Sequence, residues 1–152
     1  MSKLYDEVLL EHIKNARNYR EIEAPDARGE AANPLCGDTF SVFVRYEGEV
    51  IADLSFRCEC CGISMASASI MTEWLRGKDR REALAIKQQF IAAVAAREPS
   101  MGADAHPDHT AVLQLVAATP SRDRCAMLAW TALEAAIGGS GACPNPGASA
   151  AY

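Results

Sequence analysis

The sequence predicts an α+β domain, because helical periodicity at both ends encloses a stretch in which side chains alternate every second residue. Apolar residues recur at helical spacing over residues 3–15. Residues 40–56 alternate on either side of Glu47-Gly48, which is typical of a β-hairpin. Helical periodicity returns after Gly62. Two or three antiparallel strands with helices before and after them indicate the α+β class.

The first part of the chain combines a short helix with an irregular segment. Leu4, Val8 and Ile13 form the apolar stripe of the first helix. Residues 16–35 contain two prolines and show no sustained period, so they are predicted to be a loop. The hairpin follows, with alternating apolar positions in each half: Phe40, Val42, Val44 and Tyr46, then Val50, Ala52, Leu54 and Phe56.

Four helices are predicted after the hairpin. The first covers residues 64–78, with Gly77 as its stop, and the second begins after Asp79 as N-cap and continues to about residue 96. Residues 97–109 contain Pro99, Gly102 and Pro107 and are predicted to be a loop. The last two helices are predicted over residues 110–118 and 120–137.

Length and composition place these elements in one domain. The chain has 152 residues, of which 49% are hydrophobic and 23% charged, as is ordinary for a globular protein. We assign residues 1–137 to the domain. Residues 138–152 are rich in glycine, proline and alanine and are expected to be a disordered tail.

Charge and hydropathy exclude several classes of function. The net charge is −5 and there is no basic run, so nucleic-acid binding is not expected. No apolar stretch approaches the roughly 18–20 residues that a membrane span needs. The N-terminus lacks the apolar core of a signal peptide, so a cytoplasmic location is expected. Six cysteines in such a chain indicate metal or redox chemistry rather than a disulfide framework.

Three cysteines and one aspartate occupy junctions between predicted elements. Cys36 and Asp38 precede the first strand, and on extended backbone their side chains point the same way. Cys61 lies between the second strand and a helix, and Cys125 is expected in the first turn of the last helix, flanked by Arg122 and Arg124. A helix N-terminus and nearby cations both favour a thiolate. The set suits Zn²⁺ or an iron–sulfur cluster, although a free cysteine can also simply fill space in a core.

Three segments together resemble the U-type iron–sulfur cluster assembly proteins, the family of IscU, SufU and the NifU N-terminal domain. The segments are Asn33-Pro34-Leu35-Cys36-Gly37-Asp38, Cys61-Gly62-Ile63-Ser64-Met65-Ala66-Ser67-Ala68-Ser69 and Arg124-Cys125-Ala126-Met127-Leu128-Ala129-Trp130. The match covers roughly residues 3–137 in the family's order. The resemblance implies a three-stranded antiparallel sheet and a metal site at Cys36, Asp38, Cys61 and Cys125.

Two features are most similar to the zinc-dependent SufU branch. Arg124 stands where scaffold members carry histidine, and residues 97–118 look like that branch's insertion. The resemblance then implies that a partner cysteine desulfurase of the SufS type passes persulfide sulfur to Cys36. It also implies that zinc holds the resting thiols and releases Cys36 by ligand exchange, and that cluster scaffold proteins act downstream.

The sequence departs from the family at Cys58 and Cys60, where glycine is usual. These thiols share one face of a strand, while Cys61 turns away from it. They either have no role or alter the site toward an iron–sulfur centre. Two rival functions therefore stay open: a scaffold for a [2Fe–2S] cluster, and a structural zinc domain without sulfur chemistry. The spacing of His106 and His109 resembles that of a pair of metal ligands, but a structural role is favoured for both. No partner is visible in the sequence for Cys143.

Overall fold

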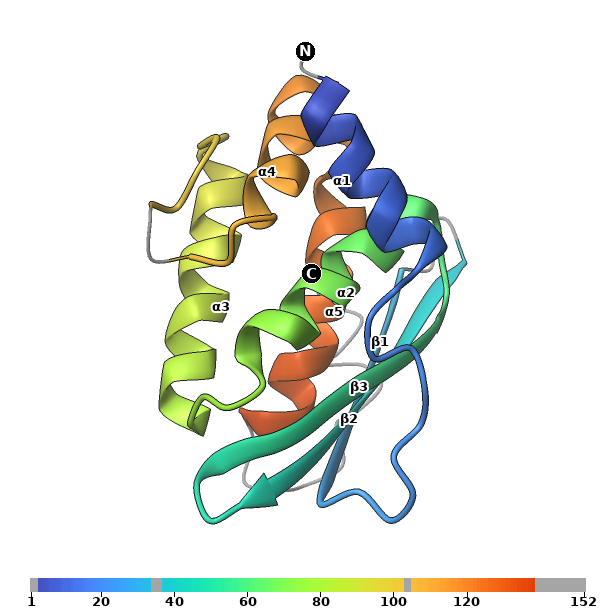
Figure 1. Ribbon diagram of the computed structural model, residues 1–152, viewed down its shortest axis with the longest axis vertical. Coiled ribbons are helices and arrows are strands. Elements are labelled where there is room, and N and C mark those ends of the chain that lie inside the picture. Colours follow the sequence, from blue (N-terminus) through green and yellow to red (C-terminus); the bar gives the residue numbers. More distant parts are fainter. Residues whose placement is uncertain (1–2, 34–36, 103–104, 139–152) are drawn as a thin grey trace.

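In the computed structural model, which describes residues 3–33, 37–102 and 105–138, a three-stranded antiparallel sheet packs against helices (Figure 1). The predicted α+β class is confirmed. The elements, in chain order, are α1 (Lys3–Lys14), β1 (Ala27–Asn33), β2 (Asp38–Glu47), β3 (Val50–Glu59), α2 (Gly62–Leu75), α3 (Arg80–Ala95), α4 (His109–Ala118), the short 3-10 helix η1 (Pro120–Arg122) and α5 (Asp123–Ile137).

The strand β1 lies inside the segment that the sequence predicted to be a loop, so that prediction is wrong for Ala27–Asn33. The strand has little intrinsic pattern, because alanine and glycine fill most of its core-facing positions. It forms by pairing with β2 in the order β1-β2-β3. A Cβ atom on Gly29 would collide with the α5 backbone at Ala132 and Ala136. The small residues are therefore required by the close approach of α5.

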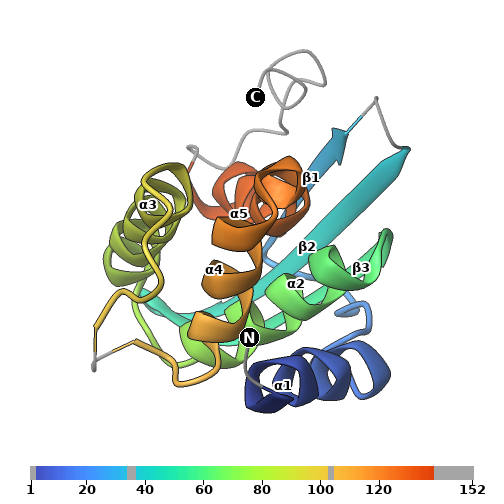
Figure 2. The same ribbon diagram turned by 90° about the horizontal axis from the view of Figure 1, so that it is seen from above.

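Two helices form the layer that lies directly on the sheet. α5 contacts β1 and β2, and α2 contacts β3. The other helices, α1, α3 and α4, pack around this pair (Figure 2). Within the part of the chain that the structure describes, no helix is long and apolar enough to cross a membrane.

The two tryptophans belong to the core. Trp130 is fully buried and stacks on Phe90, with 4.5 Å between ring centroids. Its indole N–H donates a hydrogen bond to the Ser67 hydroxyl at 3.1 Å. Trp74 meets Trp130 edge-on at 5.6 Å. This aromatic cluster joins α2, α3 and α5 in the core, at a distance along both helices from the starts that carry Cys61 and Cys125.

Element boundaries agree closely with the predicted ones, with one shift that matters for the site. The last helix was expected to begin at Pro120, but η1 covers Pro120–Arg122 and α5 begins at Asp123. Asp79 caps α3 through a capping box with Glu82, as the sequence predicted for the N-cap. Gly77 adopts φ +88°, which ends the preceding helical segment as predicted.

Candidate metal centre

Asp38, Cys61 and Cys125 come together at one end of the molecule. One ligand atom from each of these side chains lies within 4.8 Å of the others. Asp38 begins β2, Cys61 is the N-cap residue of α2, and Cys125 lies in the first turn of α5. The structure thus brings together three of the four predicted ligands from three different elements. The fourth, Cys36, and the tail residue Cys143 lie outside the described residues.

Ser64 connects the two thiol-bearing helices. Its hydroxyl donates a hydrogen bond to the backbone carbonyl of Cys125 at 3.0 Å and lies 3.5 Å from the Cys61 sulfur. Ser67 repeats this link one turn later, donating to the carbonyl of Ala126 at 2.7 Å. Both serines are buried. These hydrogen bonds fix the start of α2 against the start of α5, and they explain why α2 is rich in serine and alanine on its inner face.

Cys61 lies in surroundings that favour its thiolate. Burial by itself raises the pKa of the Cys61 thiol, but hydrogen bonds from the Ser64 hydroxyl, the Ser64 amide, the Cys125 side chain and the Ile63 amide together outweigh that effect. The net result is a pKa below the ordinary value. This agrees with the expectation that a helix N-terminus stabilises a negative charge on Cys61.

Cys125 behaves differently from the sequence-based expectation. Burial raises the pKa of the Cys125 thiol, and the neighbouring Cys61 and Asp38 act in the same direction. Arg122 offsets part of this effect, but the net pKa lies above the ordinary value. The expected net lowering of the pKa by the helix end, Arg122 and Arg124 is therefore wrong, although Arg122 acts in the expected direction. Cys125 is only 9% exposed, whereas Arg124 is exposed to solvent.

The donor set fits a divalent cation of borderline softness. Two sulfurs and one carboxylate oxygen are ligands that Zn²⁺ accepts, and a fourth position completes the usual tetrahedral number. Asp38 is also 9% exposed and Cys61 is half-buried, so the centre is partly shielded from water. Without a cation, burying three potential anions together is costly. The raised pKa of Cys125 shows part of that cost.

Cys58 and Cys60 form a disulfide at the end of β3. The alternation of a strand places both side chains on one face, but the bond between them was not predicted. The signal was present in the Cys-x-Cys spacing, since alternate residues of a strand point to the same side. The described free thiols are those of Cys61 and Cys125.

The histidines have structural partners. His109 donates from Nδ1 to the His106 carbonyl at 2.5 Å and accepts at Nε2 from the Met101 amide at 2.9 Å. His12 is fully buried between Ser69 and Asp108, at 2.7 and 2.8 Å. A second group of potential metal ligands, His12, Glu73 and Asp108, is therefore already satisfied by hydrogen bonds and by an ion pair between Arg17 and Glu73.

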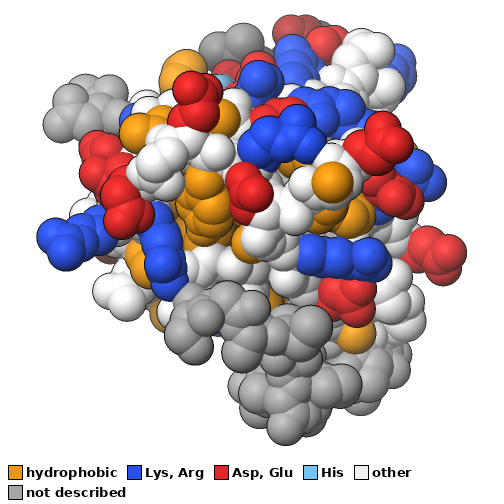
Figure 3. Space-filling model, turned by 90° about the horizontal axis from the view of Figure 1, so that it is seen from below, with side chains coloured by type: hydrophobic (Ala, Val, Ile, Leu, Met, Phe, Trp, Pro, Cys, Tyr) orange, Lys and Arg blue, Asp and Glu red, His pale blue; other side chains and the backbone are white. Residues whose placement is uncertain are grey.

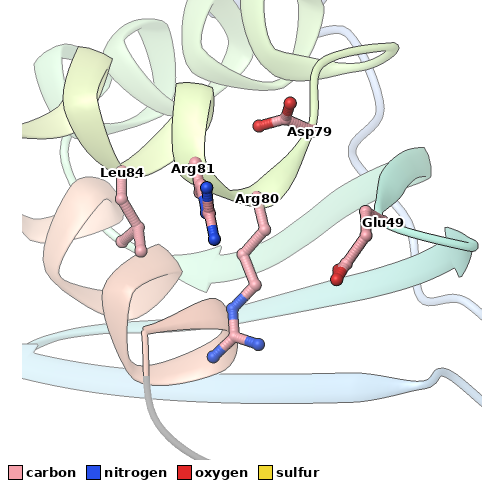
Figure 4. Close-up of a pocket in the computed structure, with 5 residues that line it drawn as sticks. All are labelled: Glu49, Asp79, Arg80, Arg81 and Leu84. Carbon is pink, nitrogen blue, oxygen red and sulfur yellow. The ribbon is translucent and has the colours of Figure 1, made fainter.

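The clearest pocket lies away from the candidate centre, at the start of α3. Its volume is about 540 Å³. Figure 4 shows its lining side chains, which come from the β2–β3 turn and from α3: Glu49, Asp79, Arg80, Arg81 and Leu84. None of these is a predicted ligand. Figure 3 shows one face of the molecule, on which basic and acidic side chains are interspersed around a small hydrophobic area.

An α+β domain in which a carboxylate and two cysteines converge at the ends of the sheet and of two helices is a candidate metal-binding protein. The family described as NifU-like N-terminal domain matches residues 4–140. The chain belongs to this family, and the predicted family membership is confirmed.

Named relatives and solved structures support this assignment. The chain is 34% identical to the "Zinc-dependent sulfurtransferase SufU" of Bacillus subtilis, over 90% of this chain and 91% of that protein. It is also 34% identical to the "Iron-sulfur cluster assembly scaffold protein IscU" of Streptococcus pyogenes, over 90% and 84%. A crystal structure of a putative iron–sulfur cluster assembly scaffold protein for the SUF system, from Fervidobacterium islandicum, superposes with a TM-score of 0.78. Its identity is 25%, over 90% of this chain and 99% of that one.

Proposed function

We propose that the protein is a zinc-dependent sulfur acceptor that serves iron–sulfur cluster assembly in the cytoplasm. Its partner is a cysteine desulfurase of the SufS type, and cluster scaffold proteins act downstream. The observation that carries the proposal is the convergence of Asp38, Cys61 and Cys125 from three elements. The names of the most similar relatives support the same class of function.

In this proposal Cys36, Asp38, Cys61 and Cys125 hold the zinc ion. Bound zinc would keep the coordinated thiols deprotonated. Ser64 contacts the Cys61 sulfur and donates a hydrogen bond to the backbone carbonyl of Cys125, so both residues remain in place at their helix starts. Cys36 is the sulfur acceptor, because it is the remaining thiol of the three in the motif and precedes the Gly37 turn, at φ +77°. The protein accepts and passes on sulfur with its partner rather than acting as an enzyme by itself.

Sulfur transfer to Cys36 can be tested with a cysteine desulfurase and free cysteine. After alkylation, mass spectrometry should find about 32 Da, one extra sulfur atom, on the peptide that contains Cys36. Cys36→Ser should abolish the transfer and retain zinc, because two thiolates, Asp38 and a water still supply four ligands. This assignment would be contradicted if the wild-type peptide that contains Cys36 carried no extra sulfur. It would also be contradicted if the wild-type protein and Cys36→Ser took up sulfur equally.

The rival function is a scaffold that assembles a [2Fe–2S] cluster on the same cysteines. It shares the Asp38, Cys61 and Cys125 donor set, whereas Arg124 at the usual histidine position favours the zinc protein. Metal analysis of protein isolated from its own cells separates the two. We expect about one zinc per chain and a colourless solution. Stoichiometric iron and sulfide with visible absorbance would establish the scaffold function instead.

A purely structural zinc domain is the third alternative. Closed structural sites are built from cysteine and histidine, whereas Asp38 supplies an oxygen ligand. The sulfur-loading experiment also decides this case. A zinc-bound protein that takes up no sulfur from any desulfurase would be a structural domain.

A further inference from the structure

The Cys58–Cys60 disulfide places two redox-active sulfurs at the edge of the candidate metal centre. Both residues are half-buried, so both keep some access to solvent. Their Cα atoms are 5.6 Å apart, within the range that a disulfide needs, so the pair can close without moving other elements. Both side chains pack against the edge of the hydrophobic core.

The strand register relates this pair to the metal centre. Phe40 pairs with Cys58, and Thr39 pairs with Glu59, the last pair of the ladder. One step further lie Asp38, the first residue of β2, and Cys60, which directly follows the last residue of β3. Residues at matching positions of an antiparallel pair share a face of the sheet. Phe40 and Asp38 are both buried, on the core-facing side. Cys60 thus stands beside a candidate ligand and directly before another, Cys61.

The proposed function requires a two-electron reduction of sulfur, which this pair of cysteines can carry out. A persulfide carries its outer sulfur at the oxidation level of elemental sulfur, whereas sulfur in an iron–sulfur cluster is sulfide. The conversion needs two electrons for each sulfur atom. Two thiols that join in one disulfide release two electrons. A reduced Cys58–Cys60 pair therefore has the required capacity for one sulfur.

We propose that Cys58 and Cys60 are a dithiol–disulfide couple that reduces sulfane sulfur delivered to this centre and releases it as sulfide. The inference rests on the proposed function, since a desulfurase supplies the sulfur as a persulfide. The observed disulfide is the oxidised product of that reaction. An external dithiol reductant returns the pair to its reduced form by thiol–disulfide exchange.

The reaction has two steps. The Cys60 thiolate attacks the outer sulfur of a persulfide, R–S–SH; the S–S bond breaks, R–SH leaves, and Cys60 becomes a persulfide. The Cys58 thiolate then attacks the Cys60 sulfur, the disulfide forms, and hydrogen sulfide leaves. The sum is R–S–SH plus two cysteine thiols giving R–SH, one disulfide and H₂S. The sulfane sulfur gains the two electrons that the thiols lose. Cys60 acts first because it is nearer the metal centre.

The test uses the full chain, reduced and then freed of reductant without air. The protein is mixed with a cysteine desulfurase and one equivalent of cysteine. Released sulfide and alkylatable thiols are then measured. The wild-type protein should release about one sulfide per chain and lose two alkylatable thiols, at Cys58 and Cys60. The Cys58→Ser/Cys60→Ser variant should release less than about a tenth as much and keep its extra sulfur.

Single variants test the order of the steps. Cys58→Ser should hold the extra sulfur on Cys60, because no second thiol can expel it, whereas Cys60→Ser should leave Cys58 unmodified. Cys143→Ser, which removes a thiol from the tail, is the matched control and should behave as wild type. Equal sulfide release by the wild-type protein and the double variant would overturn the inference. So would full alkylation of Cys58 and Cys60 after sulfur loading.

A second arm separates this inference from the proposed function. It replaces the desulfurase with a low-molecular-weight persulfide. In one outcome, the desulfurase loads no sulfur on any cysteine, but Cys58 and Cys60 still reduce the small persulfide. The proposed function is then wrong, and the inferred role of Cys58 and Cys60 is supported. If the desulfurase loads Cys36 but the double variant releases sulfide as fast as wild type, the function stands and the couple is wrong.

Discussion

Cys61 and Cys125 lie in the same candidate centre but in different surroundings. Hydrogen bonds from Ser64, Cys125 and Ile63 together outweigh burial and lower the pKa of Cys61. Burial and the neighbouring Cys61 and Asp38 raise the pKa of Cys125. The position of each cysteine at a helix start could be predicted from the sequence. The direction of the pKa shift of Cys125 could not be predicted, because its burial and its distance from Asp38 depend on tertiary packing.

We expect Cys61 to titrate at lower pH than Cys125 in the metal-free, reduced protein. As pH rises, the thiol with the lowered pKa loses its proton first and becomes reactive first. Alkylation at a series of pH values, followed by peptide mass spectrometry, gives a midpoint for each cysteine. The pH midpoints of the two cysteines are compared instead of their alkylation rates, because Cys125 is less accessible than Cys61. A lower midpoint for Cys125 would contradict the assigned environments.

At the scale of elements, β1 shows where periodicity loses its predictive value. The helices and the β2–β3 hairpin carry clear patterns, and their boundaries were predicted to within a few residues. β1 has small residues where a strand usually has branched or aromatic ones, because α5 lies directly on it. Its alternation cannot be read from hydropathy. Only the resemblance to the family required a third strand.

Gly29→Ala should destabilise the protein through the contact between β1 and α5. The added Cβ meets backbone atoms of Ala132 and Ala136, which cannot rotate away. Overpacking of this kind costs about 1–3 kcal/mol. Urea denaturation of the variant and of wild type measures the difference. Glu30→Ala is the control, because it removes only an exposed ion pair with Arg28 on the same strand. Equal midpoints for wild type and Gly29→Ala would show that α5 is not held so closely.

His12 joins three helical regions through two hydrogen bonds. It extends from α1 to Ser69 on α2 and to Asp108 at the start of α4. His12→Ala should lower the free energy of unfolding by about 2 kcal/mol or more, since it leaves a cavity and removes both hydrogen bonds. Leu10→Ala on the same helix is the control; its side chain is 51% exposed and should change stability by less than about 0.5 kcal/mol. Similar unfolding midpoints for the two variants would exclude this joining role.

At the scale of the whole molecule, the candidate centre collects the start of β2, the strand-to-helix turn after β3 and the start of α5. These positions are distant in sequence, since 64 residues separate Cys61 from Cys125. Spacing therefore could not identify the set as one site. The family resemblance predicted it, and the fold brings Asp38, Cys61 and Cys125 within reach of one ion. The disulfide beside them was not predicted, although the Cys-x-Cys spacing places both side chains on one face of the strand.

A metal ion at this centre should stabilise the whole domain, because it cross-links elements that otherwise meet only through packing. Zinc at a free concentration 100 times its Kd contributes about 2.7 kcal/mol. For a chain of this size, that corresponds to an increase in Tm of about 5–10 °C. Thermal unfolding of the reduced protein with zinc and with a chelator measures the difference. The Cys61→Ser/Cys125→Ser variant should show no response to zinc, because Asp38 and one thiol cannot retain it, whereas Leu10→Ala should keep the full response. The same Tm for the wild-type protein with zinc and with chelator would show that the three elements are not joined through a metal.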